Sequence, residues 1–418
     1  MIKKMYIWSF FIFAMALQAS NYEDFIQKLI LESYEKNPSI LSKKNAIISA
    51  NYSVDSAMWQ YFPTPSLKTE NDNKGDRITT FTLQQPLWAG GKIDASYDKA
   101  QAQTQIAKMN LDETKESLSL LINQNVYNLM SNYGKVLVQA EAIKRLEKHK
   151  EMITRRVRDG ASPDSELLLI NARLSQTQTD FSMAQSLTQK ALITLEQLLA
   201  RKLELKDFDE ILLKDSTSFV LIPKYKDENL FTKVFDTNAT LEKYTHQIRA
   251  QSYEVDIKKA VLYPNIYTKY EKNWDDTTNN STRNSSLIKI GMEYVPGAGL
   301  SSLSAIDTAK ADLLTLSRDK ENFQLELKQK IDSELSDYEF TYNRYNNYIL
   351  SVESNKQTCE SCKGLFIAGK RSWLDVLNAE RELISAQTAL CDVQAYLVTT
   401  PIRFKIFSNE LLKDSKVN

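Results

Sequence analysis

The sequence predicts a mainly α-helical fold with a small β part, in which one structural unit occurs twice. Only 10 Gly and 9 Pro interrupt the 418 residues, and the stretches between them are rich in the residues that favour long helices. A segment near residue 290 alternates apolar and polar residues as a strand does. Short motifs also recur about two hundred residues apart: 60–63 and 261–264, 98–102 and 307–311, 171–172 and 378–379, Gly160 and Gly369. A period this long excludes a short solenoid repeat.

Residues 1–19 have the pattern of a secretory signal peptide. Lys3 and Lys4 precede an apolar run of about 13 residues, and Ala19 supplies a small residue at the predicted cut. The alternative, a membrane anchor, would need about 20 apolar residues. The residue directly after the predicted cut is Ser20 and not a cysteine, so the sequence does not indicate a lipid-anchored N-terminus.

The charges of the chain balance, with 53 basic and 53 acidic residues, and removal of Lys3 and Lys4 would leave an excess of two acids. This balance gives no reason to expect a nucleic-acid partner. No later segment is long and apolar enough to cross a bilayer as a helix. If the protein lies in a membrane, the sequence therefore predicts that strands cross it.

Each half begins with helix and continues into a β-hairpin. Residues 21–60 are expected to be helical with a break at Asn37-Pro38, followed by strands at 66–72 and 77–87 around a polar turn at 73–76. The second half repeats the hairpin at 263–274 and 285–295, with a longer polar loop at 275–284.

The last predicted strand has the sharpest alternation. Ile288, Ile290 and Met292 point one way, and Lys289 and Glu293 point the other. A strand of this kind suits a transmembrane barrel that faces lipid and water. The alternative is an edge strand of a soluble sandwich.

A joint rich in Pro and Gly follows each hairpin and is expected to turn a strand into a helix. Its residues are Pro86, Gly90 and Gly91 in the first half and Pro296, Gly297 and Gly299 in the second. Uninterrupted helices then run over 92–158 and 301–368. At 1.5 Å per residue, each would be on the order of 100 Å long.

Both long helices end at a glycine, and helix-starting signals follow at once. Ser162-Pro163-Asp164 offers an N-cap and a first-turn proline, and residues 372–375 form a capping box. Each half therefore ends in a long antiparallel helical hairpin. The expected domains are the signal peptide 1–19, a first repeat 20–201, a lateral connector 202–228, a second repeat 229–412 and a loose tail 413–418.

Four strands per chain cannot close a barrel, and open edges in lipid would leave backbone groups unpaired at several kcal/mol each. Further copies of the same chain must therefore complete the sheet. Eight strands leave an interior filled by side chains, so three or more copies are needed for a water-filled channel.

This order of elements resembles the TolC family of outer-membrane channel proteins. The resemblance rests on residues 85–91 after the first hairpin and on the tip motifs 155–160 and 369–379. Residues 296–302 and 372–379 look most like the branch that serves type I secretion. The resemblance implies a homotrimer in which a 12-stranded barrel in the outer membrane continues into a long α-helical barrel across the periplasm. It also implies a periplasmic adaptor and an inner-membrane ABC transporter as partners.

The resemblance further implies roles for particular residues. Asp375 and Asn378 match an acidic ring that narrows the periplasmic entrance, although Asn378 is not acidic, which predicts weaker cation selectivity. The alternative for Asp375 is that it only completes the cap with Ser372. The residues expected to contact the adaptor lie at the two helical tips: Arg158, Asp159, Gly160, Ala161, Ala368, Gly369, Lys370 and Arg371. The glycines there are alternatively needed only to turn the chain.

Cys359 and Cys362 are a candidate disulfide or a pair of free thiols, and Cys391 lies too far along the returning helix to join them. No metal site or cofactor is expected. Residues 297–299 lack the third glycine and the lysine of a phosphate loop. No nucleophile, base and orienting group can be assembled, so an enzyme is not expected.

The sequence therefore predicts a passive exit duct of a tripartite export system that serves type I protein secretion. A small-molecule or drug efflux channel is the first alternative. A periplasmic coiled-coil stalk without a pore is the second, and the alternating strand near residue 290 argues against it.

Overall fold

The computed structural model describes residues 22–71, 77–209, 211–212, 227, 229–276, 282–298 and 301–410. The predicted signal peptide, the turn at 73–76, most of the connector, Gly299 and the C-terminal tail lie outside these residues. Residues 22–36 are helical. The first repeat continues with α2 (Pro38–Trp59), β1 (Thr64–Asn71), β2 (Arg77–Trp88), α3 (Lys92–Arg158) and α4 (Asp164–Leu199). The second contains α5 (Leu230–Thr237), α6 (Ala239–Ala260), β3 (Asn265–Asp276), β4 (Thr282–Glu293), α7 (Ser301–Ile367) and α8 (Trp373–Phe407).

The order of helices and strands in the first half recurs in the second, and the limits of α3 are those predicted. Pro38 opens α2 because a proline at the first helical position needs no hydrogen-bonded N–H. Asn238 caps α6 by accepting a hydrogen bond from the Leu241 N–H at 3.0 Å. The strand ends differ from prediction by two or three residues in the second hairpin, because cross-strand pairing sets them.

Two compact units divide the chain, and each combines parts of both repeats. We call Met1–Pro38, Lys115–Thr237 and Lys328–Asn418 the tip unit, and Ser39–Thr114 and Asn238–Leu327 the sheet unit. The repeats are therefore units of sequence, whereas the compact units form by packing one repeat against the other.

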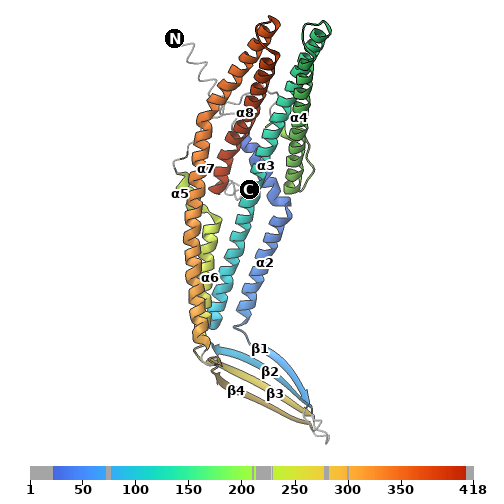
Figure 1. The fold of residues 1–418 in the computed structure, drawn as a ribbon. Coiled ribbons are helices and arrows are strands. Elements are labelled where there is room, and N and C mark those ends of the chain that lie inside the picture. The colour runs from blue at the N-terminus through green and yellow to red at the C-terminus, as the bar shows by residue number, and fades with distance from the viewer. Residues whose placement is uncertain are drawn as a thin grey trace, which may run out of the picture. The chain divides into compact units, whose positions relative to one another are not determined.

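The four strands form one antiparallel sheet in the order β1-β2-β3-β4, so that β1 and β4 are its two edges (Figure 1). β3 and β4 pair without interruption from Asn265 opposite Glu293 to Asp276 opposite Thr282. The β2–β3 register shifts between Pro86 and Trp88, where the proline cannot donate a ladder hydrogen bond. Ion pairs join the helices of the sheet unit, including Lys99 of α3 with Glu254 of α6 at 2.8 Å.

The core of the tip unit is a series of apolar side chains on its long helices. Ile122, Val126 and Leu129 of α3 are fully buried. Part of the connector is a 3₁₀ turn, η1 (Leu205–Phe208), in which Phe208 is buried and packs edge-on against Phe25 with ring centroids 5.8 Å apart. No described helix is both long enough and apolar enough to cross a membrane.

Candidate functional site

The first tip turn joins α3 to α4 around Gly160, whose φ is +72°. The Ala161 N–H donates to the Arg156 carbonyl at 2.7 Å, and the Gly160 N–H donates to that of Val157 at 3.0 Å. This pair of bonds satisfies the last carbonyls of α3, and it needs a residue that tolerates positive φ.

The second tip turn repeats the first, bond for bond. The Lys370 N–H donates to the Leu365 carbonyl at 2.8 Å, and the Gly369 N–H donates to that of Phe366 at 3.0 Å, with φ of +71° at Gly369. A Cβ on either tip glycine would meet no atom of the chain within 4 Å. The turn itself thus accounts for both glycines.

α8 begins with the predicted capping box. The Ser372 hydroxyl accepts a hydrogen bond from the Asp375 N–H at 3.2 Å, and the Asp375 carboxylate accepts from the Ser372 N–H at 3.1 Å and from its hydroxyl at 2.8 Å. These hydrogen bonds, together with Arg371 4.0 Å away, hold the pKa of Asp375 below its usual range. The carboxylate therefore remains ionised while its side chain is 40% exposed.

α4 begins differently from the prediction. Its N-cap is Pro163, which makes no side-chain cap, so Ser162 was the wrong candidate. The Ser162 hydroxyl instead accepts a hydrogen bond from Arg156 Nε at 3.1 Å, and Arg156 also donates to the Ala161 carbonyl. Arg156 of α3 thus binds the residues that follow Gly160 in the first tip turn.

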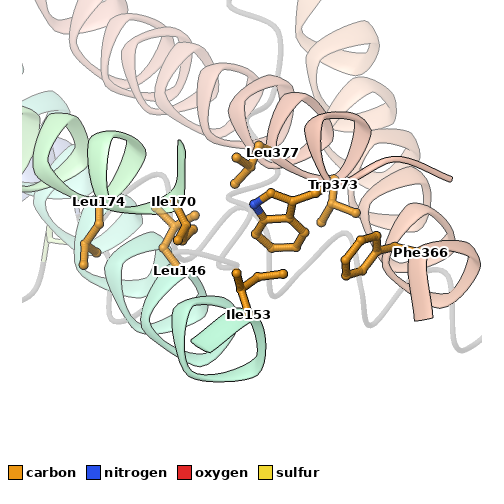
Figure 2. Packing of buried hydrophobic residues seen from close by; sticks show 8 residues of the cluster. Leu146, Ile153, Ile170, Leu174, Phe366, Trp373 and Leu377 are labelled. Atoms are coloured by element: carbon orange, nitrogen blue, oxygen red, sulfur yellow. The ribbon is translucent and has the colours of Figure 1, made fainter. Parts of the chain in front are cut away.

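A hydrophobic cluster packs the two hairpins together just behind the tips. Figure 2 shows Trp373 and Phe366 of the second hairpin pointing toward Ile153 of the first. Trp373 is 1% exposed, and its ring lies 5.1 Å from that of Phe366 and 5.7 Å from that of His149. Arg156 stacks over Phe366 at 4.9 Å. The rest of the cluster is Leu146, Ile170, Leu174, Val376 and Leu377.

One buried carboxylate joins three helices behind this cluster. Glu380 of α8 accepts a hydrogen bond from Arg145 Nε of α3 at 3.1 Å and lies 3.2 Å from His149 Nε2. The Cys359 thiol of α7 also hydrogen-bonds it. Burial alone would raise the pKa of Glu380, but these donors and the Arg145 charge hold it at about 2.

Sequence reasoning missed Glu380 and its partners. A signal was present, since Glu380 lies one heptad after Trp373 on the face of α8 that also holds Val376, Leu377 and Leu383. An acid among buried apolar positions requires a partner. That partner could not be identified from sequence, because Arg145 is 235 residues away.

The three cysteines are free in the structure. Burial raises the pKa of Cys359 and of Cys391 to about 12, so neither is a ready thiolate. Cys362 is half-buried against the tip cluster. Among the described residues, no group of three or more His, Cys, Asp or Glu is placed to hold a metal ion.

The joints lie where strands give way to the long helices. Gly90 and Gly91 have φ of +61° and +81° between β2 and α3, and Gly297 has φ of +87° before α7. A Cβ on Gly90 would lie 2.9 Å from the Ala260 carbonyl oxygen, so this joint packs tightly. Pro86 lies inside β2 and Pro296 follows β4. Their action as hinges remains a prediction.

The sheet has one apolar and one polar face. Ile288, Ile290 and Met292 of β4 share a face and are 71–78% exposed in the single chain. On the opposite face, Lys289 of β4 donates to Glu271 of β3, which also pairs with Lys269. The predicted alternation is confirmed, and nothing in the described chain covers the apolar face.

The sequence pattern of the family described as outer membrane efflux protein matches residues 29–201 and 231–404, one stretch in each half of the chain. The chain belongs to this family. It is 23% identical over 368 residues to the alkaline protease secretion protein AprF of Pseudomonas aeruginosa, covering 82% of this chain and 73% of AprF. The resemblance to TolC-like proteins inferred from sequence is thereby confirmed.

Solved structures of outer-membrane proteins share the fold. The Campylobacter jejuni CmeC outer membrane channel superposes with a TM-score of 0.78 at 14% identity, covering 95% of this chain and 90% of that one. The Vibrio cholerae outer membrane protein VceC gives 0.76 at 14% identity, covering 92% and 95%. Family and fold are therefore those of outer-membrane channel proteins, with the helical part in the periplasm.

Proposed function

We propose that three copies of this chain form an exit duct, in which a shared 12-stranded barrel in the outer membrane continues as a helical tunnel across the periplasm. The observation that carries the proposal is the incomplete sheet of four strands with edges at β1 and β4. Open edges in lipid are costly, and copies joined edge to edge remove them.

Exposed apolar side chains support the same assembly. In the sheet unit, the helices next to the sheet edges are α2, which leads into β1, and α7, which follows β4. Both carry large exposed apolar residues: Leu41, Ile48, Tyr52, Met58 and Trp59 on α2, and Leu303, Leu314 and Leu325 on α7. The inner helices, α6 and residues 92–114 of α3, carry none.

The spacing of these residues makes a straight seam on each helix. At about 100° per residue, Leu41, Ile48, Tyr52 and Trp59 lie within about 20° of one line along α2. Leu303, Leu314 and Leu325 recur every eleven residues, which also keeps them nearly in line. If β4 of one copy pairs with β1 of the next, these seams meet and are buried.

The two faces of the sheet support its orientation in the barrel. The apolar face of β4 would contact lipid, and the charged face with Lys289 and Glu271 would line a watery interior. At the other end of the tunnel, Asp375 and Asn378 would narrow the entrance. The tip residues Arg158 to Ala161 and Ala368 to Arg371 would contact a periplasmic adaptor coupled to an inner-membrane ABC transporter.

Protein secretion is the first candidate for the cargo. It rests on the similarity to AprF, whose name is that of a protease secretion protein. Small-molecule efflux is the second candidate, supported by the efflux function in the family description. In both, the duct is passive and the energy comes from the inner membrane.

Mass and conductance test the proposal together. The purified protein in detergent should have the mass of three copies by native mass spectrometry, and it should produce stepwise conductance in planar lipid bilayers. A single-copy mass without conductance would contradict the duct and favour a stalk. Deleting the gene then separates the cargoes: loss of a secreted protein with unchanged drug susceptibility indicates secretion, and the reverse indicates efflux.

A further inference from the structure

Gly291 and Tyr267 face each other across β3 and β4 as a registered pair. An ideal Cβ on Gly291 would lie 2.6 Å from Cζ and 2.7 Å from Oη of Tyr267. Side chains do not tolerate such distances, so the tyrosine ring occupies the space that any other residue at 291 would need. The ring therefore lies across the backbone of β4, against the sheet.

This pair belongs to the polar face of the sheet. Side chains two residues apart on a strand share a face, so Tyr267 lies on the same face as Lys269 and Glu271. Gly291 likewise shares its face with Lys289, which donates to Glu271. The opposite face holds Ile290 and Met292, so the ring does not contribute to the apolar surface.

The pair also has a definite level along the strands. β4 runs from Thr282 near the hairpin loop to Glu293, eight residues before α7 begins at Ser301. Gly291 is therefore close to the end of the sheet at which the long helices start. In the proposed trimer, three such rings would lie at this one level of the interior.

We propose that the Tyr267–Gly291 pair sets the width of the duct where barrel meets tunnel, with Gly291 keeping the ring against the wall and out of the path. This rests on the proposed duct with its polar face inward. A larger residue at 291 displaces the ring, and on an inward face the only free space is the lumen. The width at this level thus depends on the absence of one methyl group per copy.

Apart from displacing the Tyr267 ring, Gly291→Ala is expected to disturb neither the backbone nor the packing. The glycine does not have positive φ, so alanine fits its backbone. The atoms that a new Cβ meets are the far end of the Tyr267 side chain, which can rotate away. The variant is therefore expected to fold, insert and form the same trimer.

Accessibility of single cysteines measures the width at this level alone, whatever the width at the periplasmic entrance. Ser285→Cys and Glu293→Cys place thiols on the polar face on the two sides of the pair, the first nearer the hairpin loop. A membrane-impermeant maleimide of small or bulky size is added outside intact cells. Protein with only its three native cysteines gives the background.

In the native-width duct, the bulky maleimide should react at both positions. Gly291→Ala should slow the reaction of the bulky maleimide at residue 293 about threefold relative to residue 285. The reason is that three displaced rings narrow the interior of a 12-stranded barrel. The small maleimide should be unaffected. The measured ratio is the rate of the bulky maleimide at residue 293 divided by its rate at residue 285. Adding Tyr267→Ser to Gly291→Ala should restore the native value of this ratio, and Tyr267→Ser alone should raise it.

Each other result has a definite meaning. An unchanged ratio in both Gly291→Ala and Tyr267→Ser overturns the width-setting role. Equal slowing at residues 285 and 293 also overturns it, because the change is then not local to this level. Failure of even the small maleimide to reach either thiol in otherwise unaltered protein contradicts the proposed duct instead.

Discussion

Trp373 behind the tips and Ile290 on the sheet are both large apolar side chains, yet they are 1% and 78% exposed. At the tips, four helices of the same chain enclose the indole. On β4, no described part of the chain covers the isoleucine. The charged groups differ in the same way. Glu380 is buried beside its partners Arg145 and His149, whereas Lys289 and Glu271 pair on the polar face of the sheet.

The difference separates apolar side chains that one chain can bury by itself from those that need lipid or another copy to cover them. The cluster around Trp373 resembles the interior of a globular domain, so changes in it should reduce the stability of each copy. The sheet unit exposes apolar side chains that only lipid or another copy can cover. Changes there should affect insertion and assembly.

The largest effect is expected at Trp373. Trp373→Ala should lower the free energy of unfolding of the tip unit by about 4 kcal/mol, because it leaves a cavity among Ile153, Phe366 and Leu377. Hydrogen exchange of the tip amides measures this. The next residue gives the control: Leu374 is 52% exposed, and Leu374→Ala should stay within about 0.5 kcal/mol. Equal losses would mean that the cluster does not form.

Acid should weaken the tip unit through Glu380. Because the folded pKa of about 2 lies below the ordinary value of 4.5, its stabilisation is fully present above pH 4.5 and is lost as pH falls toward 2. The difference corresponds to about 3 kcal/mol at neutral pH. Glu380→Gln should therefore lie well below the native protein in tip stability at pH 7, and the gap should close by pH 2 to 3. A gap independent of pH would contradict the ion pair with Arg145.

In the sheet, a matched pair of apolar residues tests the two faces. Ile290→Lys should cost about 2–4 kcal/mol per copy on insertion, since the side chain would meet lipid. Leu287→Lys should cost far less, because Leu287 pairs with Glu271 on the polar face. The fraction of protein that folds into lipid vesicles, read from gel mobility without heating, distinguishes them. Equal yields would argue against the proposed orientation.

Local signals made most of the fold predictable. The ends of α3, the tip glycines and the capping box of residues 372–375 follow from Gly, Pro and cap residues within a few positions. Ser162 was wrong as the N-cap because α4 starts after Pro163 without any side-chain cap. The structure instead uses Ser162 to bind Arg156.

Contacts between the repeats could not be predicted in the same way. Glu380 stands out as an acid on an apolar helical face, but its pairing with Arg145 and His149 depends on how α3 packs against α8. Likewise, the sequence of β4 predicted its alternation of apolar and polar residues. The position of Tyr267 over Gly291 depends on the register of β3 and β4, which the sequence does not show. Pairing across the chain carries no local sequence signal, which is why the inferred adaptor and entrance residues remain proposals.

Two glycines near the second tip should respond to alanine in opposite directions. Gly369→Ala should destabilise the tip by about 1 kcal/mol because its φ is +71°. Gly364→Ala should stabilise α7 by about 0.5–1 kcal/mol, since Gly364 is helical and a Cβ there meets nothing within 4 Å. Thermal unfolding in detergent shows the signs. A loss at both positions would mean that Gly364 also serves a contact.

The smallest stability change and the sharpest functional one are expected at Asp375. Asp375→Asn keeps a side-chain oxygen that can accept from Ser372, so stability should change by only a few tenths of a kcal/mol. The substitution would, however, remove one negative charge per copy, and so three in all, from the proposed entrance. Cation selectivity and block by divalent cations should therefore both fall in single-channel recordings.

Ser372→Ala is the control that separates the two roles of this carboxylate. It removes the cap at a cost of about 1 kcal/mol while leaving Asp375 charged. If the carboxylate acts on passing ions, Ser372→Ala should retain the native selectivity although it is the less stable variant. If selectivity follows stability instead, and Asp375→Asn conducts as the native protein does, Asp375 serves only to start α8 and the constriction lies elsewhere.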